Sequence, residues 1–257
     1  MKKKIQNFLL QLGDYTLLLG ATLRVSVIDP FRGKGPRATH IVHQMFAIGV
    51  QSLGIVCLVV FFVGLVIAMQ TSYELLKLGA ETSVGRVVGL TMLRELGPLI
   101  ATIVLGGRCG AAIAAEIGTM KVNEEVEALK VMGIDPIRFL LAPRVIAFTT
   151  MAPVLAVIAD YVGILGGFLL AITQLHLTPA QFTDTLINGL EMKDFISGIV
   201  KSGVFGLLVG SIACYFGYRT EGGAEEVGRA TTLSVVTSII MIIVADALLT
   251  AIFVYIV

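Results

Sequence analysis

The feature that most constrains this chain is a succession of long apolar segments. Between Thr39 and Tyr73 there is no Asp, Glu, Lys or Arg, and about 20 apolar residues already suffice for a helix to cross a bilayer. Only 14% of the residues are charged, against roughly a quarter in soluble domains. The sequence therefore excludes a soluble enzyme, a disordered chain and a coiled coil. It predicts an all-α integral membrane protein with five transmembrane helices, at about 45–70, 87–118, 145–173, 195–218 and 230–257.

The first 38 residues differ from the rest because their apolar side chains recur at helical spacing among polar ones. This pattern is typical of an amphipathic helix that lies in the membrane interface, and the breaks at Asp29-Pro30 and Gly33–Pro36 end it. A signal peptide would need an uninterrupted apolar stretch, and polar residues interrupt this one. We therefore expect an interfacial elbow helix and linker at 1–38, followed by a transmembrane domain at 39–257.

Lys and Arg are distributed unevenly over the segments between the predicted spans. If the N-terminus lies in the cytoplasm, the inner segments carry thirteen of them and the outer segments three. Because short cytoplasmic segments are enriched in Lys and Arg, the sequence predicts this orientation. The odd number of spans then places the C-terminus outside.

The most polar internal stretch, residues 119–144, predicts a short acidic helix at about 124–132 on the inner face. Asn123 is a favourable N-cap, Gly133 suits the position after the helix, and Asp135-Pro136 stops it. The first turn carries three carboxylates, which favour the helix dipole: Glu124, Glu125 and Glu127. Such a helix is either part of an ordinary solvated loop or a docking element for a cytoplasmic motor.

The outer loop at 174–194 contains a second helix signal. Thr178 and Gln181 have the spacing of a capping box, and Pro179 between them suits the first helical position. We therefore expect a short outer-side helix at about 179–191.

Three ionisable residues lie at similar depth inside two of the predicted spans: Arg94, Glu95 and Lys201. Charged groups in a bilayer are costly unless they are paired or hydrated, and Gly97-Pro98 can kink the helix and open space beside them. We expect a polar pocket in the outer half of the membrane, where Arg94 and Lys201 would suit a lipid phosphate. The alternative is a structural ion pair that binds no ligand.

Two further carboxylates, Asp160 and Asp246, lie near the middle of their spans, with Arg108 available as a counter-charge. They either join helices or form a proton path. The three cysteines lie in apolar segments without metal-ligand spacing, and no Walker A motif occurs. We therefore expect neither a metal site nor a nucleotide site in this chain.

Several short blocks of sequence follow one another in a specific order. They are TMLRELGP at 91–98, GGRCGA at 106–111, AEIGTM at 115–120, MGIDP at 132–136 and GRATT at 228–232. Together these blocks resemble the MlaE/YrbE permease family, the membrane subunits of lipid-transporting ABC systems, and the resemblance covers nearly the whole chain.

The resemblance implies a non-catalytic permease subunit, multi-pass in the bacterial inner membrane and homodimeric. Its expected partners are a cytoplasmic ATPase, which would bind ATP and Mg, an outer-facing MCE-domain protein and often a STAS-domain protein. It implies transport of phospholipid between the inner membrane and the cell envelope, which maintains outer-membrane lipid asymmetry. It also implies that the acidic helix couples to the ATPase.

For the site, the resemblance implies that Arg94, Glu95 and Lys201 line a lipid-binding cavity. Tyr73, Leu75 and Leu78 would add apolar contacts. Two other functions remain open on the residues alone. A secondary transporter would carry protons on Asp160 and Asp246, and a membrane scaffold would transport nothing.

Overall fold

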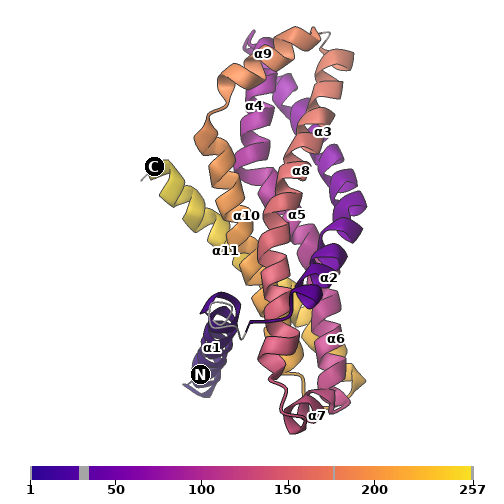
Figure 1. Ribbon diagram of the computed structural model, residues 1–257. Coiled ribbons are helices and arrows are strands. Elements are labelled where there is room, and N and C mark those ends of the chain that lie inside the picture. The colour runs from indigo at the N-terminus through magenta and orange to yellow at the C-terminus, as the bar shows by residue number, and fades with distance from the viewer. Residues whose placement is uncertain (1, 29–34, 176, 256–257) are drawn as a thin grey trace. The chain divides into compact units, whose positions relative to one another are not determined.

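The computed structural model describes residues 2–28, 35–175 and 177–255, and all regular secondary structure within them is helical (Figure 1). The predicted break at Asp29-Pro30, with the residues up to Lys34, lies outside the described residues. Five helical stretches are long and apolar enough to cross a membrane, which confirms the predicted number of spans. They are Ala38–Lys77, Val84–Val122, Ile137–Gln174, Met192–Tyr218 and Ala224–Phe253. The orientation of these spans stays a prediction.

The spans are assembled from helices with the following bounds. The first comprises α2 (Ala38–Ile48) and α3 (Leu53–Lys77), and the second comprises α4 (Val84–Thr91), α5 (Gly97–Leu105) and α6 (Ala111–Val122). The third contains α8 (Ala142–Gln174), the fourth is α10 (Met192–Tyr218) and the fifth is α11 (Ala224–Tyr255). Three helices lie outside the spans: α1 (Lys2–Leu23), α7 (Glu125–Val131) and α9 (Pro179–Gly189).

Single π-helical turns interrupt the second span at η5 (Met92–Leu96) and η6 (Gly106–Gly110), and a third, η7 (Ile137–Leu141), precedes α8. The cause is clear at η5. Pro98 has no N–H, so the carbonyl of Arg94, four residues earlier, loses its α-helical donor. In an α-helix the N–H of Gly97 would bond the carbonyl of Leu93, four residues back. Here it bonds the carbonyl of Met92, five residues back, which makes the turn π-helical. Such π-turns inside helices frequently mark functional sites.

The chain forms two compact units. The first comprises Met1–Ile48, Gly106–Thr149 and Leu207–Met241, and the second comprises Gly49–Leu105, Thr150–Gly206 and Ile242–Val257. Helices α8, α10 and α11 contribute residues to both units. Each unit is described separately below.

The second unit has a core of mostly small and β-branched residues: Val56, Val60, Ala68, Val84, Val88, Met92, Ala101, Ala159 and Leu170. Glycines bring its helices into backbone contact. A Cβ on Gly64 of α3 would overlap the carbonyl of Gly163 on α8, and one on Gly198 of α10 would overlap the carbonyl of Leu93 in η5. In lipid, burial of apolar surface does not drive helices to associate, so their packing depends on close contact. Small residues at the contacts allow this close approach.

The predicted capping box is confirmed at the start of α9. Thr178 Oγ1 accepts from the N–H of Gln181 at 3.3 Å, and Gln181 Oε1 accepts from the N–H of Thr178 at 3.0 Å. The helix packs against α4, where added Cβ atoms on Gly85 and Gly89 would contact it. It ends at Gly189, two residues before the predicted end.

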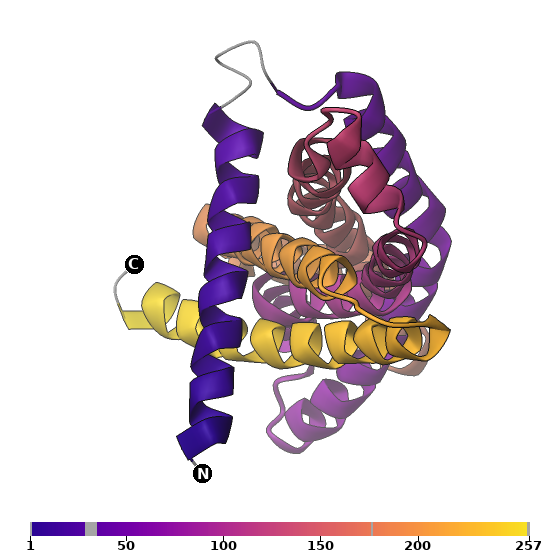
Figure 2. The same ribbon diagram turned by 90° about the horizontal axis from the view of Figure 1, so that it is seen from below.

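In the first unit, polar contacts fix α1 against α10, and Figure 2 shows the backbone of both helices. Tyr15 Oη lies 2.7 Å from Ser211 Oγ, and Arg219 Nη1 lies 3.1 Å from Asp14 Oδ2. The Tyr15 and Tyr215 rings meet edge to face with centroids 5.5 Å apart. The predicted N-terminal helix is therefore confirmed as a helix, and its place in the membrane interface stays a prediction.

The short acidic helix is observed as α7, but Asn123 is not its N-cap as the sequence suggested. Because α6 continues through Val122, the N–H of Asn123 bonds the carbonyl of Thr119 and ends that helix. Glu124 makes the reversal, with a left-handed φ of 59°. Gly133 follows α7 with a φ of 74°, as predicted for the residue after the helix.

Candidate functional site

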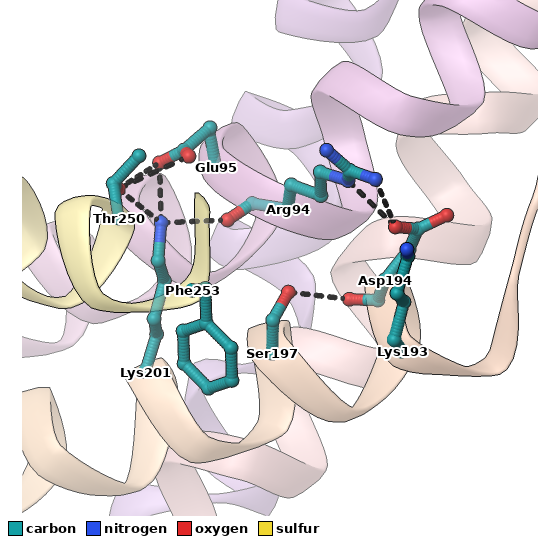
Figure 3. Close-up of a pocket in the computed structure, with 8 residues that line it drawn as sticks. All are labelled: Arg94, Glu95, Lys193, Asp194, Ser197, Lys201, Thr250 and Phe253. Atoms are coloured by element: carbon teal, nitrogen blue, oxygen red, sulfur yellow. Dashed lines mark hydrogen bonds and ion pairs between the residues drawn. The ribbon is translucent and has the colours of Figure 1, made fainter. Parts of the chain in front are cut away.

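A cavity of about 280 Å³ lies in the second unit, where η5, α10 and α11 meet (Figure 3). The residues that line it are Arg94, Glu95, Lys193, Asp194, Ser197, Lys201, Thr250 and Phe253. The three ionisable residues predicted from the sequence are therefore brought together. The segment that carries two of them is the π-turn beside Gly97-Pro98.

Lys201 is the centre of the floor of this cavity and is only 1% exposed. Its Nζ donates to Glu95 Oε2 at 2.6 Å and to Thr250 Oγ1 at 2.7 Å, and lies 3.0 Å from Asp246 Oδ1. It also donates at 3.0 Å to the carbonyl of Arg94. This is the carbonyl that Pro98 leaves without a helical donor. The buried ammonium is thus neutralised by two carboxylates and hydrogen-bonded in full.

Arg94 lies nearer the mouth and is held differently. Its Nε and Nη2 lie 2.6 and 2.5 Å from Asp194 Oδ1. Asp194 is 1% exposed, and its Oδ2 accepts from the N–H of Glu191 at 2.8 Å, which places it at the start of α10. The side chain of Arg94 remains 43% exposed. It can therefore accept an anionic ligand without leaving its carboxylate.

The charged side chains of the site are paired with one another. Arg94 pairs with Asp194, and Lys201 pairs with Glu95 and Asp246. The exposed Lys193 in the same lining pairs with Glu191. Removing one partner of a buried ion pair strands the other charge, which costs far more than the pair itself contributes. An anion that enters would meet Arg94 and the exposed Lys193 first. Direct contact with Lys201 requires Lys201 to give up one of its oxygen partners, so its role in phosphate binding stays a prediction.

Sequence reasoning did not place Asp246, Thr250, Lys193 or Asp194 at this site, and the first two had a signal. Asp246 and Thr250 are four residues apart, so they share one helix face that could complement Lys201. Arg108 was considered as a counter-charge for Asp246, and the structure gives Asp246 an ion pair with Lys201. Arg108 donates to the carbonyl of Ala47 at 3.4 Å. Lys193 and Asp194 had no comparable signal, because the sequence assigns them to a polar outer loop, whereas they lie in the first turn of α10.

The predicted apolar contributors are not part of this cavity lining. Tyr73 and Leu78 are exposed, at 62% and 77%, and Lys77 Nζ lies 4.0 Å above the Tyr73 ring. Leu75 packs against the core of the second unit. Their contact with lipid stays a prediction.

Asp160 is 4% exposed, and its Oδ1 has no hydrogen-bond partner among the described residues. The oxygen lies directly against Gly97, where any Cβ would overlap it. The absence of a side chain at Gly97 thus makes room for this carboxyl. Neither a packing role nor a proton path is tested by this arrangement.

The α7 helix carries the three predicted docking glutamates, but they differ in their surroundings. Glu127 Oε1 pairs with Lys121 and lies 3.9 Å from Lys130. The hydrogen bond from Lys121 lowers the pKa of this carboxyl. Glu124 and Glu125 are exposed. Val126 and Leu129 bury the opposite face and anchor the helix in the first unit.

Beside these glutamates lies an apolar surface that the sequence analysis did not identify. Val131, Met132 and Ile134 are exposed at 89%, 65% and 38%. Exposed apolar residues at the end of a polar helix are typical of a protein-binding surface. The sequence feature that could have indicated this surface is the MGIDP block at 132–136, in which apolar residues follow the helix without helical periodicity.

Five candidate spans, with a charged cavity lined by residues of three of them, define a multi-pass membrane protein with a polar site inside its helices. The match to known proteins agrees. The model of the family described as Permease MlaE matches residues 41–252. The chain therefore belongs to the MlaE permease family, as the sequence blocks indicated.

Individual relatives extend this match over most of the chain. A probable ABC transporter permease protein of Rickettsia felis is 39% identical over 98% of this chain and 95% of its own length. A protein of Synechocystis with a similar description is 38% identical over 79% and 77%. The Haemophilus influenzae protein described as the intermembrane phospholipid transport system permease protein MlaE is 37% identical over 82% of each chain.

Proposed function

We propose that this chain is the membrane-spanning subunit of an ATP-driven transporter that moves phospholipid between the inner membrane and the periplasm or outer membrane. The observation that carries the proposal is the charged cavity at η5, with the half-exposed Arg94 at its mouth and a compensated Lys201 in its floor. A phosphate can bind the guanidinium by paired hydrogen bonds, and the adjoining spans provide an apolar path for acyl chains. The description of the Haemophilus relative supports phospholipid as the cargo.

The transport cycle requires a separate ATPase, which would hold ATP and Mg. We place its docking surface on α7, because exposed carboxylates at Glu124 and Glu125 adjoin the apolar surface of Val131, Met132 and Ile134. The apolar part provides affinity, and the charges provide orientation and rate of association. The remaining proposed assembly is a homodimer with an MCE-domain protein on the outer side and a STAS-domain protein inside, acting in lipid asymmetry at the bacterial inner membrane.

The docking proposal is tested by co-purification of the ATPase encoded beside this reading frame. The double variant Glu124→Lys/Glu125→Lys should weaken co-purification modestly, because each exposed pair contributes up to about 1 kcal/mol. Adding Glu127→Lys should weaken it further, and the apolar variant Val131→Ser/Met132→Ser should weaken it most.

The matched control reverses three exposed glutamates of the other predicted inner segment, Glu221, Glu225 and Glu226. Undiminished co-purification in both the triple α7 variant and the apolar variant would remove the docking assignment.

The transport proposal is tested in proteoliposomes that contain the co-purified complex and a fluorescent phospholipid. ATP should drive lipid movement between leaflets or to an acceptor, and a catalytically dead ATPase should abolish it. A proton-coupled transporter using Asp160 and Asp246 would instead respond to a pH gradient without ATP. Movement that follows the gradient and persists without the ATPase would refute the ABC proposal.

A further inference from the structure

A second cavity, of about 300 Å³, lies in the first unit and shares no lining residue with the site above. It forms where two segments that are distant in sequence meet, the start of α2 and the turn between α7 and α8. The lining residues are Gly35, Pro36, Arg37, His40, Gly133, Ile134, Asp135, Arg138, Phe139 and Pro143. The transport proposal assigns no ligand to this cavity, although Ile134 of the proposed docking surface is one of its lining residues.

The polar side of the cavity is cationic. Arg37 and Arg138 contribute two guanidinium groups, and His40 adds an imidazole whose ring meets that of Phe139 edge to face at 5.0 Å. Among the described lining residues the acidic one is Asp135, whose Oδ1 accepts the N–H of Ile137 at 3.0 Å. The described part of the lining thus holds two guanidinium groups and one carboxylate, which favours an anion.

The rest of the lining is apolar, with two prolines, Ile134 and Phe139. The cavity also lies at the first residues of two candidate spans, Ala38–Lys77 and Ile137–Gln174. The apolar spans predicted from the sequence begin a few residues further along, at about 45 and 145, so the cavity lies at the level expected for lipid phosphates. One to two turns further along α2, Val42 and Phe46 are exposed at 63% and 53%, and they can contact acyl chains.

We infer that this cavity binds the phosphate group of an anionic phospholipid from the leaflet on the α7 side, the predicted inner leaflet. Two guanidinium groups can each form paired, charge-assisted hydrogen bonds to phosphate oxygens. A volume of about 300 Å³ is at the small end for ligand pockets. It therefore suits a head group with its glycerol, while the chains stay in the bilayer. Such a lipid would bridge α2 to the turn that follows α7.

The test uses the purified chain in detergent without any ATPase, so that its outcome is independent of transport. Native mass spectrometry measures binding of dioctanoyl phosphatidylglycerol, phosphatidylcholine of the same chain length and inorganic phosphate. We expect saturable binding of phosphatidylglycerol, weaker binding of phosphatidylcholine and no displacement by phosphate at millimolar concentration. Arg37→Gln and Arg138→Gln should each weaken phosphatidylglycerol binding about tenfold, which is the loss of a hydrogen bond to a charged group.

The matched control is Lys130→Gln, an exposed cation on the adjacent α7, which should leave binding within about twofold because exposed charges contribute little. The conservative variant Arg37→Lys/Arg138→Lys keeps the charge and should bind at an intermediate level, which shows that a loss in the Gln variants is not misfolding. A photoactivatable phosphatidylglycerol should crosslink to peptides that contain 35–40 or 133–143.

Four results would overturn the proposal. They are equal binding of the two lipids, displacement by inorganic phosphate alone, crosslinks confined to the cavity at η5, and Gln variants that bind like the wild type. If the Gln variants lost the ATPase but kept full lipid binding, the cavity would be a protein-docking site. That result would also refute the lipid assignment.

Discussion

Replacement of Lys201 by methionine tests how the floor of the η5 cavity is held together. The change leaves the carboxylates of Glu95 and Asp246 without their shared cation. Breaking a buried ion pair by removing one partner costs about 3–5 kcal/mol. Because the two carboxylates are 35% and 19% exposed, we expect the lower end, about 3 kcal/mol. For a chain of this size that lowers the melting temperature by about 6–12 °C.

The structure also predicts which additional substitutions should restore the lost stability. Since Lys201 has two acidic partners, adding Glu95→Gln restores only part of the stability, and adding Asp246→Asn as well restores more. The assay heats purified protein in detergent and measures the fraction that remains monodisperse. Lys193→Met is the control, because the Lys193 side chain is 54% exposed and its ion-pair partner among the described residues is the exposed Glu191. It should cost less than about 1 kcal/mol.

Phospholipid phosphorus per purified complex then separates the two roles of Lys201. If the ammonium contacts the lipid phosphate, as the sequence analysis predicts, lipid content stays low in the triple variant although its stability recovers. If Lys201 only neutralises the carboxylates, lipid content recovers together with stability. Full lipid content and an unchanged melting temperature in Lys201→Met would refute both the head-group role and the reasoning about buried charge.

Three further predictions concern other parts of the chain. A periplasm-active reporter fused after residue 257 should be active, because five spans with the N-terminus inside place the C-terminus outside; a signal only from a cytoplasm-active reporter would contradict this. Gly198→Ala should destabilise the protein by about 1–3 kcal/mol, since the new Cβ overlaps a backbone carbonyl of η5, whereas Gly54→Ala, which meets open space, should not. Because the folded pKa of Glu127 is lowered, its pair with Lys121 stabilises α7 at neutral pH, and this is lost as the pH falls below the ordinary carboxyl range. At that low pH, hydrogen exchange of the α7 backbone amides, corrected for the intrinsic exchange rate, should be faster than at neutral pH. In the Lys121→Met variant the corrected exchange rate should no longer depend on pH in this way.

The parts of the fold that could be predicted from the sequence are those set by local chemistry. The hydropathy of five segments specifies the spans, because a bilayer requires each span to satisfy its own backbone. The hydroxyl of Thr178 and the amide of Gln181 specify the start of α9, and the conformational freedom of Gly133 specifies the turn after α7. None of these signals depends on which helices are neighbours.

The parts that could not be predicted depend on helix neighbours and register. Arg94, Glu95 and Lys201 were placed together from their depth and charge, and Asp246 was not placed with them because depth does not say which helix faces meet. Asn123 failed as an N-cap because the preceding helix continued to Val122, and continuation depends on packing rather than on the capping residue. Pro98 indicates in the sequence that the helix is irregular at η5. That the carbonyl of Arg94 then accepts a hydrogen bond from Lys201 could not be predicted, because it depends on which helix lies beside η5.

The carbonyl of Arg94, left without a helical donor by Pro98, connects the sequence block RELGP to the function proposed for it. Pro98 removes one helical hydrogen bond, and the carbonyl of Arg94 that it releases would be costly inside a membrane if nothing replaced the lost donor. Lys201 supplies the replacement, and Glu95, next to Arg94 in the same turn, supplies part of its counter-charge. The floor of the cavity is therefore complete without a ligand, so the site stays stable between one cargo molecule and the next. The first contact with an entering anion then falls to Arg94, whose guanidinium is 43% exposed while Asp194 holds it in place.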